Sequence, residues 1–172
     1  MKKSMRALLL LSLLAPALPT ATAAVTTAIM VNTVVVVGVC AISATGFATT
    51  YDPTGANASS NQDATGSVST LCTNGATATI TLGQGLNAAP GSTDAVPLRR
   101  LSSGGGSPTY LNYSLSQDAS RTVAWGNTLA TGVLVNGTGN LAPVTAYARL
   151  PSAQVNATVG TYTDTVIATV TF

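Results

Sequence analysis

The sequence predicts an all-β protein built as an antiparallel sandwich with Greek-key connections. Short segments that alternate apolar and polar residues recur along the chain at about ten-residue spacing, as in β-sandwiches. Turn-forming Gly, Asn, Asp and Pro residues separate these segments. No segment beyond the first two dozen residues repeats with the 3.6-residue period of an amphipathic helix. An up-and-down barrel is the alternative architecture.

The first 23 residues have the pattern of a secretory signal peptide. Lys2, Lys3 and Arg6 form a basic start, an apolar run follows over 7–14, and Ala21-Thr22-Ala23 supplies a small-residue cleavage pattern. The apolar run is too short to span a membrane as a helix. Cleavage after Ala23 leaves 172 − 23 = 149 residues, the size of one domain.

The composition of the remaining chain excludes several functions. Of the seven Lys and Arg residues, three leave with the signal, so four arginines face five aspartates and the net charge is 4 − 5 = −1. Such a chain has no basic stripe for phosphates, so we expect no nucleic-acid partner. It also contains no His, Lys or Glu after residue 23, which removes the usual general bases and metal ligands. We therefore expect no enzyme, cofactor or metal.

The stretch 24–39 dominates the prediction because every odd position from 25 to 39 is β-branched. Sixteen extended residues span about 50 Å, whereas an ordinary strand covers about 17–20 Å. The stretch is therefore expected to serve as two strands. We interpret 24–35 as an extension that pairs outside its own domain, and 36–172 as the domain, with a first strand over 36–43. The residues expected to carry the outside contact are Val25, Ile29, Val31, Thr33 and Val35.

Two cysteines, Cys40 and Cys72, remain in the exported chain. An even count in an oxidising compartment predicts one disulfide. Two free thiols or a metal site are the alternatives, but no histidine or further cysteine is available to complete such a site.

The pattern predicts further strands and one hairpin. Asn74-Gly75 between two β-rich runs indicates a hairpin turn that joins 66–73 to 76–83. Loops are expected over 49–64, 83–94, 103–108 and 151–160. The other expected strands are 41–47, 97–102 at a sheet edge, 110–116, 128–135, 143–150 and 161–172.

The last predicted strand has one apolar face and reaches the final residue of the sequence, with no following strand to cover it. Its other face is threonine-rich and interrupted by Ile167. The chain thus has an unpaired apolar strand at one end and a surplus strand at the other. Strand addition between molecules would pair both, and a repeated head-to-tail contact gives a fibre.

These residues resemble the spore coat protein U domain, the fold of archaic chaperone–usher pilins, over the whole chain after the signal. The resemblance rests on the order and spacing of several motifs rather than on one. They are the valine-rich stretch that leads to Cys40, Gly66-Ser-Val-Ser-Thr-Leu-Cys72, Leu98-Arg99-Arg100-Leu101, Tyr110-Leu-Asn-Tyr113-Ser-Leu115, Asp118, Trp125-Gly126 and the closing run from Gly160 to Phe172.

The resemblance implies an incomplete immunoglobulin-like sandwich that lacks its last strand and is completed by a donated strand. It implies a periplasmic chaperone, an outer-membrane usher, other pilus subunits and further copies of the chain itself as partners. Structural roles would fall to Tyr162, Asp164 and Trp125, with Tyr162 holding its loop as a tyrosine corner. The acceptor groove, which is also the chaperone-binding strand, would consist of Val166, Ala168, Val170 and Phe172.

The function expected from this resemblance is that of a structural pilus subunit. It would be exported to the periplasm, polymerised by donor-strand exchange, and displayed at the cell surface in adhesion or biofilm formation. Two alternatives stay open. One is a spore-coat or surface structural protein of the same fold that assembles without an usher, and the other is a self-complete secreted binding module.

Overall fold

The computed structural model describes residues 19–172, so most of the expected signal peptide lies outside the described residues. The described chain divides between Val35 and Val36 into two units. Residues 19–39 belong to no strand, and the first strand of the domain begins at Cys40. The expectation that this strand begins at Val36 is therefore wrong: the regular ladder with the neighbouring strand begins at the Cys40–Cys72 pair, preceded by a hydrogen bond from the Thr73 amide to the Val39 carbonyl.

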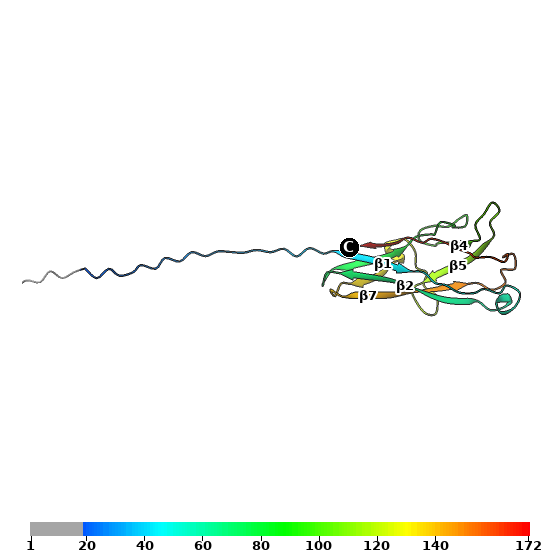
Figure 1. The fold of residues 1–172 in the computed structure, drawn as a ribbon, viewed down its shortest axis with the longest axis horizontal. Helices are drawn as coiled ribbons and strands as arrows, with labels where there is room; N and C mark the ends of the chain where they lie inside the picture. Colours follow the sequence, from blue (N-terminus) through cyan, green and yellow to red (C-terminus); the bar gives the residue numbers. More distant parts are fainter. Residues whose placement is uncertain (1–18) are drawn as a thin grey trace, which may run out of the picture. The chain divides into compact units, whose positions relative to one another are not determined.

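Within residues 19–172, eight strands and two short 3-10 helices form two antiparallel sheets (Figure 1). The five-stranded sheet has the order β1-β2-β7-β5-β4, and the three-stranded sheet has the order β6-β3-β8. Separate sheets confirm the predicted sandwich and exclude the barrel alternative. The elements are β1 (Cys40–Thr45), η1 (Ala56–Ala58), β2 (Gln62–Cys72), β3 (Thr77–Leu82), β4 (Arg99–Ser102), β5 (Tyr110–Ser116), η2 (Leu129–Thr131), β6 (Val133–Asn136), β7 (Leu141–Leu150) and β8 (Ala168–Thr171).

The predicted hairpin around Asn74-Gly75 is wrong in its pairing. A tight turn is present, since the Ala76 amide donates to the Thr73 carbonyl and Gly75 has a φ of 83°. However, β2 pairs with β1 and β7, whereas β3 pairs with β6 and β8. The turn therefore carries the chain from one sheet to the other.

Three other boundaries differ from the sequence prediction. The expected strand over 128–135 begins with a 3-10 turn whose cap is the Thr128 hydroxyl, and only Val133–Asn136 is strand. Strand β2 begins at Gln62, inside the expected loop, because residues 62–71 pair with β7 throughout. The expected strand 161–172 is regular only over Ala168–Thr171; before it, Thr163 forms an isolated bridge to Ser102.

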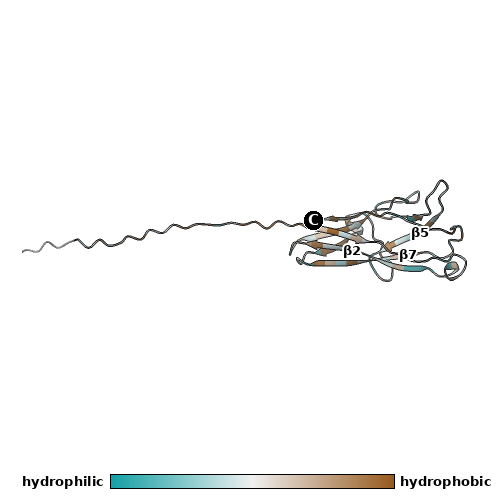
Figure 2. Ribbon diagram, in the orientation of Figure 1, coloured by the Kyte–Doolittle hydropathy of each residue, from teal (hydrophilic) through white to brown (hydrophobic). Residues whose placement is uncertain are grey.

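The core lies between the two sheets and is closed by Trp125, which is fully buried. The Trp125 indole donates a 2.9 Å hydrogen bond to the Ile80 carbonyl of β3, and its backbone amide donates to the Leu115 carbonyl of β5. One residue therefore ties the two sheets together. Hydrophobic segments recur along β2, β5 and β7 (Figure 2), and the buried apolar residues are Val68, Ile80, Leu82, Leu111, Tyr113, Leu115, Ala146, Ala148 and Leu150.

Among the residues that the structure describes, none belongs to a helix long and apolar enough to cross a membrane.

Candidate functional site: an open groove between the first and last strands

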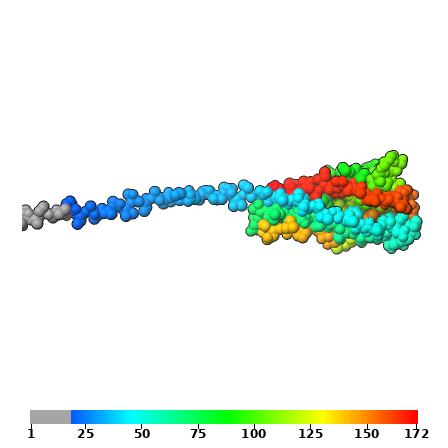
Figure 3. Space-filling view, in the orientation of Figure 1, coloured from blue at the N-terminus to red at the C-terminus, as the bar shows by residue number. Residues whose placement is uncertain are grey.

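Strands β1 and β8 each have a free edge. In the part of the chain that the structure describes, β1 pairs only with β2, and β8 pairs only with β3. The two strands belong to different sheets, and they lie next to each other along one face of the sandwich (Figure 3). A free edge is a row of backbone donors and acceptors that another strand can pair with.

The free edge of β8 is formed by the even-numbered residues. The Ile167 carbonyl accepts from the Gly83 amide at 2.8 Å, and the Thr165 carbonyl accepts from the Leu86 amide at 3.1 Å. Odd-numbered residues therefore direct their backbone groups toward the β3 side of the sheet. Backbone groups alternate along a strand. The N–H and C=O groups of Val166, Ala168 and Val170 consequently point toward the open side.

The free edge of β1 follows the same logic. The Val39 carbonyl accepts from the Thr73 amide at 2.9 Å, which makes the odd-numbered residues the ones that pair with β2. The backbone groups of Cys40, Ile42 and Ala44 then point outward. Two strand edges thus face a common gap, each with a free hydrogen-bonding group at every second residue.

Between these edges the structure contains an open cavity of about 380 Å³. Small residues of both edge strands line its mouth, and apolar residues of five other strands form its floor. The lining residues used below are Ala44, Val68, Leu82, Leu115, Ala146, Val166 and Ala168. We call this cavity the groove.

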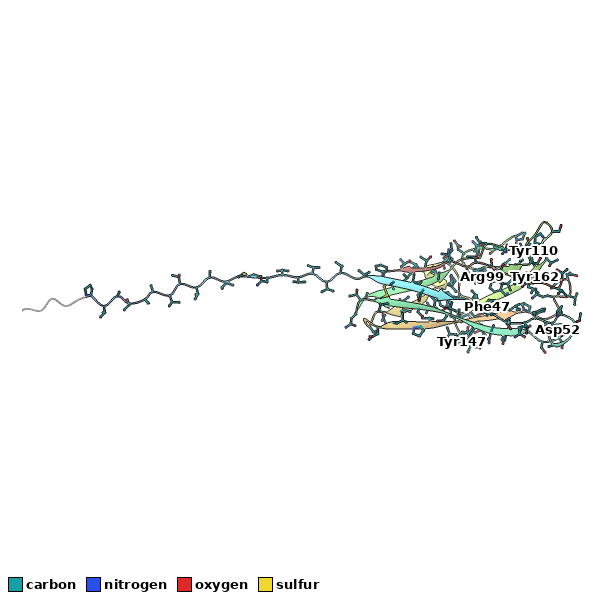
Figure 4. The ribbon with its side chains drawn as sticks, in the orientation of Figure 1. Phe47, Asp52, Arg99, Tyr110, Tyr147 and Tyr162 are labelled. Atoms are coloured by element: carbon teal, nitrogen blue, oxygen red, sulfur yellow. A yellow bond between two sulfur atoms is a disulfide. The ribbon has the colours of Figure 1, made fainter. Side chains whose placement is uncertain are left out.

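A second cavity, of about 540 Å³, adjoins the groove at the end that faces the 151–160 loop. The two cavities share Phe47, Leu101 and Tyr162 as lining residues. Phe47 packs edge-on against Tyr113, with ring centroids 5.5 Å apart, and Figure 4 shows Phe47 and Tyr162 at this part of the domain. The apolar space therefore continues past the groove toward the loops.

Asp164 fixes the segment that forms one wall of the groove. Its Oδ2 accepts a 2.7 Å hydrogen bond from the Tyr113 hydroxyl, and its Oδ1 accepts from the amide and the side chain of Asn87. Burial, followed by the hydrogen bond to Asp164, raises the pKa of the Tyr113 hydroxyl far above its ordinary value. The phenol therefore stays protonated and remains a donor.

Beneath this wall lies a buried arginine that the sequence analysis did not single out. Arg99 is 2% exposed, and its guanidinium donates 2.8 Å hydrogen bonds to the carbonyls of Leu82, Gly83 and Trp125. Burial lowers the pKa of Arg99, although Tyr113 and Asp164 act in the opposite direction. A guanidinium remains protonated even so. Arg99 thus fastens three chain segments around the floor of the groove.

Tyr162 holds the loop that enters the last strand. Its hydroxyl accepts from the Thr158 amide at 2.8 Å and lies 2.9 Å from the Thr158 carbonyl. It also contacts the Thr109 hydroxyl. A tyrosine hydroxyl bound to backbone a few residues upstream is the geometry of a tyrosine corner.

The predicted disulfide is present and confirmed. Cys40 and Cys72 are directly opposite each other on β1 and β2, with 4.1 Å between their Cα atoms. The hydrogen-bonding pattern above makes this a non-hydrogen-bonded pair, in which opposed side chains come closest. The bond therefore fixes the first residue of the groove's β1 wall.

The structure assembles part of the predicted groove set. Val166 and Ala168 line the groove, whereas Val170 and Phe172 do not, and Phe172 is 59% exposed. Trp125 lies in the core rather than at the groove, and Asp164 and Tyr162 hold the wall. The predicted donor residues lie in the extension, where each side chain is exposed: Val25, Ile29, Val31, Thr33 and Val35.

The sequence analysis missed the floor of the groove and its far wall. Tyr113 could have been found, because it lies on the apolar face of a strand whose bounds were predicted as the structure has them. Ala44 and Phe47 gave no such signal, since nothing local marks the end of β1 as a cavity wall. Within residues 19–172, no group of three or more metal-ligating side chains is placed to hold a metal ion.

Comparisons with known proteins agree with this fold. The family model of the Spore Coat Protein U domain matches residues 25–169. A curated relative, Protein U of Myxococcus xanthus, is 50% identical over 125 residues, which cover 72% of this chain and 69% of the relative.

One similar solved structure is a pre-assembly complex of a chaperone and a tip adhesion subunit, CsuC–CsuE, from archaic chaperone–usher Csu pili of Acinetobacter baumannii. The match has a TM-score of 0.51 at 18% identity, and it covers 80% of this chain and 40% of that chain. At this identity the likeness concerns the fold, an immunoglobulin-like sandwich.

Proposed function

Because the chain belongs to the spore coat protein U domain family, we propose that it is a structural subunit that polymerises by strand donation between copies. The family is structural rather than enzymatic, in agreement with the expectation of a non-enzyme. In the proposed assembly, residues 25–35 of one molecule fill the groove of the next. The observation that carries the proposal is the pair of free strand edges, β1 and β8, on either side of one apolar cavity.

The extension matches this groove in length and in chemistry. Residues 25–35 and residues 162–172 are both eleven residues long, so each spans about 33 Å over ten extended steps. One face of the extension is apolar apart from two threonines, as an apolar floor requires. Both edges offer backbone groups at alternate residues, so an inserted strand would be hydrogen-bonded on both sides.

The proposal includes export and assisted assembly. The N-terminal pattern supports secretion, and a free apolar edge needs cover before assembly because it otherwise templates aggregation. A periplasmic chaperone that lends a strand, and an outer-membrane usher that exchanges it, would supply that cover. The fold likeness to a subunit from a chaperone–usher pilus supports this pathway and a location on the cell-surface pilus.

A second candidate is a coat protein of the same fold that assembles without an usher. The 50% identity to Protein U and the name of the family favour it. Removing the usher gene from cells that make the protein separates the two, because only a pilus subunit then fails to reach the surface.

Deletion of residues 24–34 tests the strand donation itself. We expect loss of multimers on gels run without boiling, while a soluble chaperone-bound monomer remains. A matched pair sharpens the test: Ile29→Asp places a charge on the inward face and should abolish multimers, whereas Asn32→Asp places it on the outward face and should leave them. Unchanged multimers in the deletion variant, or a stable wild-type monomer made without a chaperone, contradicts the proposal.

A further inference from the structure

The inserted strand has one register, and two exposed apolar residues mark it. We propose that Met30 of the donating molecule lies directly opposite Ile167 of the accepting molecule, in a strand antiparallel to the 162–172 segment. This register runs from residue 25 opposite 172 to residue 35 opposite 162. The inference rests on the proposed function and specifies which residues of the second copy the groove accepts.

The direction of the donated strand follows from the position of the donor's own domain, which comes directly after these residues in the chain. The donated residues are followed by their own domain from Val36, and β1 begins at Cys40. The start of β1 and the C-terminus lie at the same end of the sandwich (Figure 1). If the donated strand left the groove at this end, the donating and accepting domains would face each other with the ends at which their β1 strands begin. A donor that leaves at the Tyr162 end gives a repeating head-to-tail contact, and it runs antiparallel to β8.

The register is restricted further by which side chains of each strand point inward and which point outward. Along 162–170 the even-numbered side chains are partly buried and the odd-numbered ones are exposed. Directly opposed residues of an antiparallel pair lie on the same face of the sheet. The odd-numbered apolar face of the extension must therefore oppose even-numbered residues, which leaves only registers that differ by two residues.

Inside the groove, size and polarity select one of these. Ile29 is the largest side chain on the inward face of the extension, and in the proposed register it lies opposite Ala168. Ala44 and Ala146 also line the groove, so small residues of three strands leave room in it for the largest donated side chain. Thr33 falls opposite Asp164, the one carboxylate among the inward residues of 162–172. The Thr33 hydroxyl thus meets the carboxylate, whereas Ile29 and Val31 meet Ala168 and Val166, the two residues of this segment that line the apolar part of the groove.

On the outer surface, a second and independent match selects the same register. Ile167 is 68% exposed and stands among threonines at 161, 163, 165, 169 and 171. Met30 is 79% exposed and has Thr26, Ala28 and Asn32 as its outward neighbours in the extension. Only the proposed register brings these two apolar side chains together, where each covers apolar surface that is otherwise in water.

The neighbouring registers lose both matches. A shift in one direction puts Met30 opposite Thr169, Asn32 opposite Ile167 and a valine opposite Asp164. The opposite shift puts Met30 opposite Thr165 and Val31 opposite Asp164. In each case an apolar side chain faces the carboxylate and the outer apolar pair is broken.

Cysteine pairs at these positions test the register directly. Because even-numbered residues of β8 form the hydrogen bonds to the donor, Met30 and Ile167 would be a non-hydrogen-bonded pair with Cα atoms about 4.5 Å apart, within disulfide range. The Cys40–Cys72 pair has this geometry in the domain itself. The variant Met30→Cys/Ile167→Cys should give a ladder of multimers that survives boiling and disappears with reductant.

The matched controls keep Met30→Cys and move its partner by two residues, to Thr165→Cys or Thr169→Cys. Each shift adds about 7 Å along the strand, which is beyond disulfide reach. We expect covalent dimer at least about fivefold below that of the Ile167→Cys variant, since the reactive geometry is then absent. A greater yield with either control assigns another register and overturns the inference.

A second measurement does not depend on introduced thiols. Met30→Thr and Ile167→Thr should each lower the temperature at which multimers dissociate in detergent, and the double variant should lower it no further, because one contact is lost in all three. Leu134→Thr removes an exposed side chain from the outer face of the same sheet and should change nothing. Additive effects of the two single variants would overturn the pairing.

The outcomes separate this inference from the function on which it rests. If residues 24–34 are needed for multimers but Met30→Cys cross-links at none of the three positions, the register is wrong and strand donation stands. If multimers persist without residues 24–34, both fail.

Discussion

The Tyr113 hydroxyl lies 2.7 Å from Oδ2 of Asp164, so a strand of the five-stranded sheet holds the segment that leads into β8 of the other sheet. This contact joins the floor of the groove to the segment that forms one of its walls. Replacing Tyr113 by Phe removes the donor but keeps the ring that packs on Phe47. We expect a loss of about 1–2 kcal/mol in the free energy of unfolding, measured by chemical denaturation of the purified multimers.

Asp164→Ala should destabilise the domain more than Tyr113→Phe does. The substitution leaves the buried Tyr113 hydroxyl without an acceptor and also removes both hydrogen bonds from Asn87. An unsatisfied buried donor costs about 1–3 kcal/mol beyond the lost bond. If the two variants unfold at the same denaturant concentration, Asp164 acts through something other than this contact.

Gly85 depends on the same carboxylate. Its φ is +86°, and a Cβ at this position would overlap the Asp164 side chain. Gly91 offers a matched control with a φ of +82° and open space around its Cβ position. Gly91→Ala should cost about 1–2 kcal/mol from the backbone conformation alone, and Gly85→Ala distinctly more. Equal unfolding midpoints for the two variants would show that the Asp164 side chain moves aside freely.

The disulfide should contribute to both stability and assembly. The bond closes a separation of 32 residues, for which the chain-entropy model gives about 3–4 kcal/mol. We expect Cys40→Ser/Cys72→Ser to lower the unfolding free energy by about that amount and to reduce the yield of assembled protein. Ser43→Ala, on the exposed face of β1, serves as the control. A normal yield of multimers from the double variant would make the bond dispensable.

Acid should weaken the outer face of the five-stranded sheet. The Arg149 guanidinium donates bidentate hydrogen bonds of 2.7 and 2.8 Å to the two carboxylate oxygens of Asp63. A guanidinium nitrogen of Arg121 lies 3.2 Å from the same carboxylate. The hydrogen bonds from Arg149, then the charge of Arg121, hold the pKa of Asp63 below its ordinary value.

A carboxyl group with a lowered pKa in the folded state stabilises the fold above its unfolded pKa, and this contribution is lost as the pH falls below about 4. Asp63→Asn should therefore show a shallower fall in unfolding midpoint between neutral and acid pH. Identical pH profiles for the variant and the wild type would contradict this assignment.

The sequence predicted those strands whose two faces differ in polarity. Strand β5 alternates Leu111, Tyr113 and Leu115 with polar residues, and its bounds were predicted as the structure has them. The start of β2 could not be found this way, because Gln62 and Asp63 are strand residues only through pairing with β7. That partner is more than 80 residues away, so no local pattern contains the information.

The remaining errors have the same origin. Asn74-Gly75 specifies a tight turn between β2 and β3. Whether β3 then pairs with β2 or crosses to the other sheet depends on distant strands. Likewise, the groove depends on Ala44 and Phe47 meeting the far end of the chain. Arg99 could not be predicted as a core residue because an arginine in a short strand normally faces solvent, and its three carbonyl acceptors come from two other segments.

The position of the Cys40–Cys72 bond decides how the domain responds to a pulling force. A tension applied through the residues before Cys40 reaches β1 at its first residue, where it could otherwise peel the strand away one hydrogen bond at a time. The disulfide passes that load to β2, which pairs with β1 on one side and with β7 over ten residues on the other. Removal of β1 from the sheet then also requires separation of β2 from β7, so the covalent bond adds ten residues of pairing to the part of the domain that bears the load.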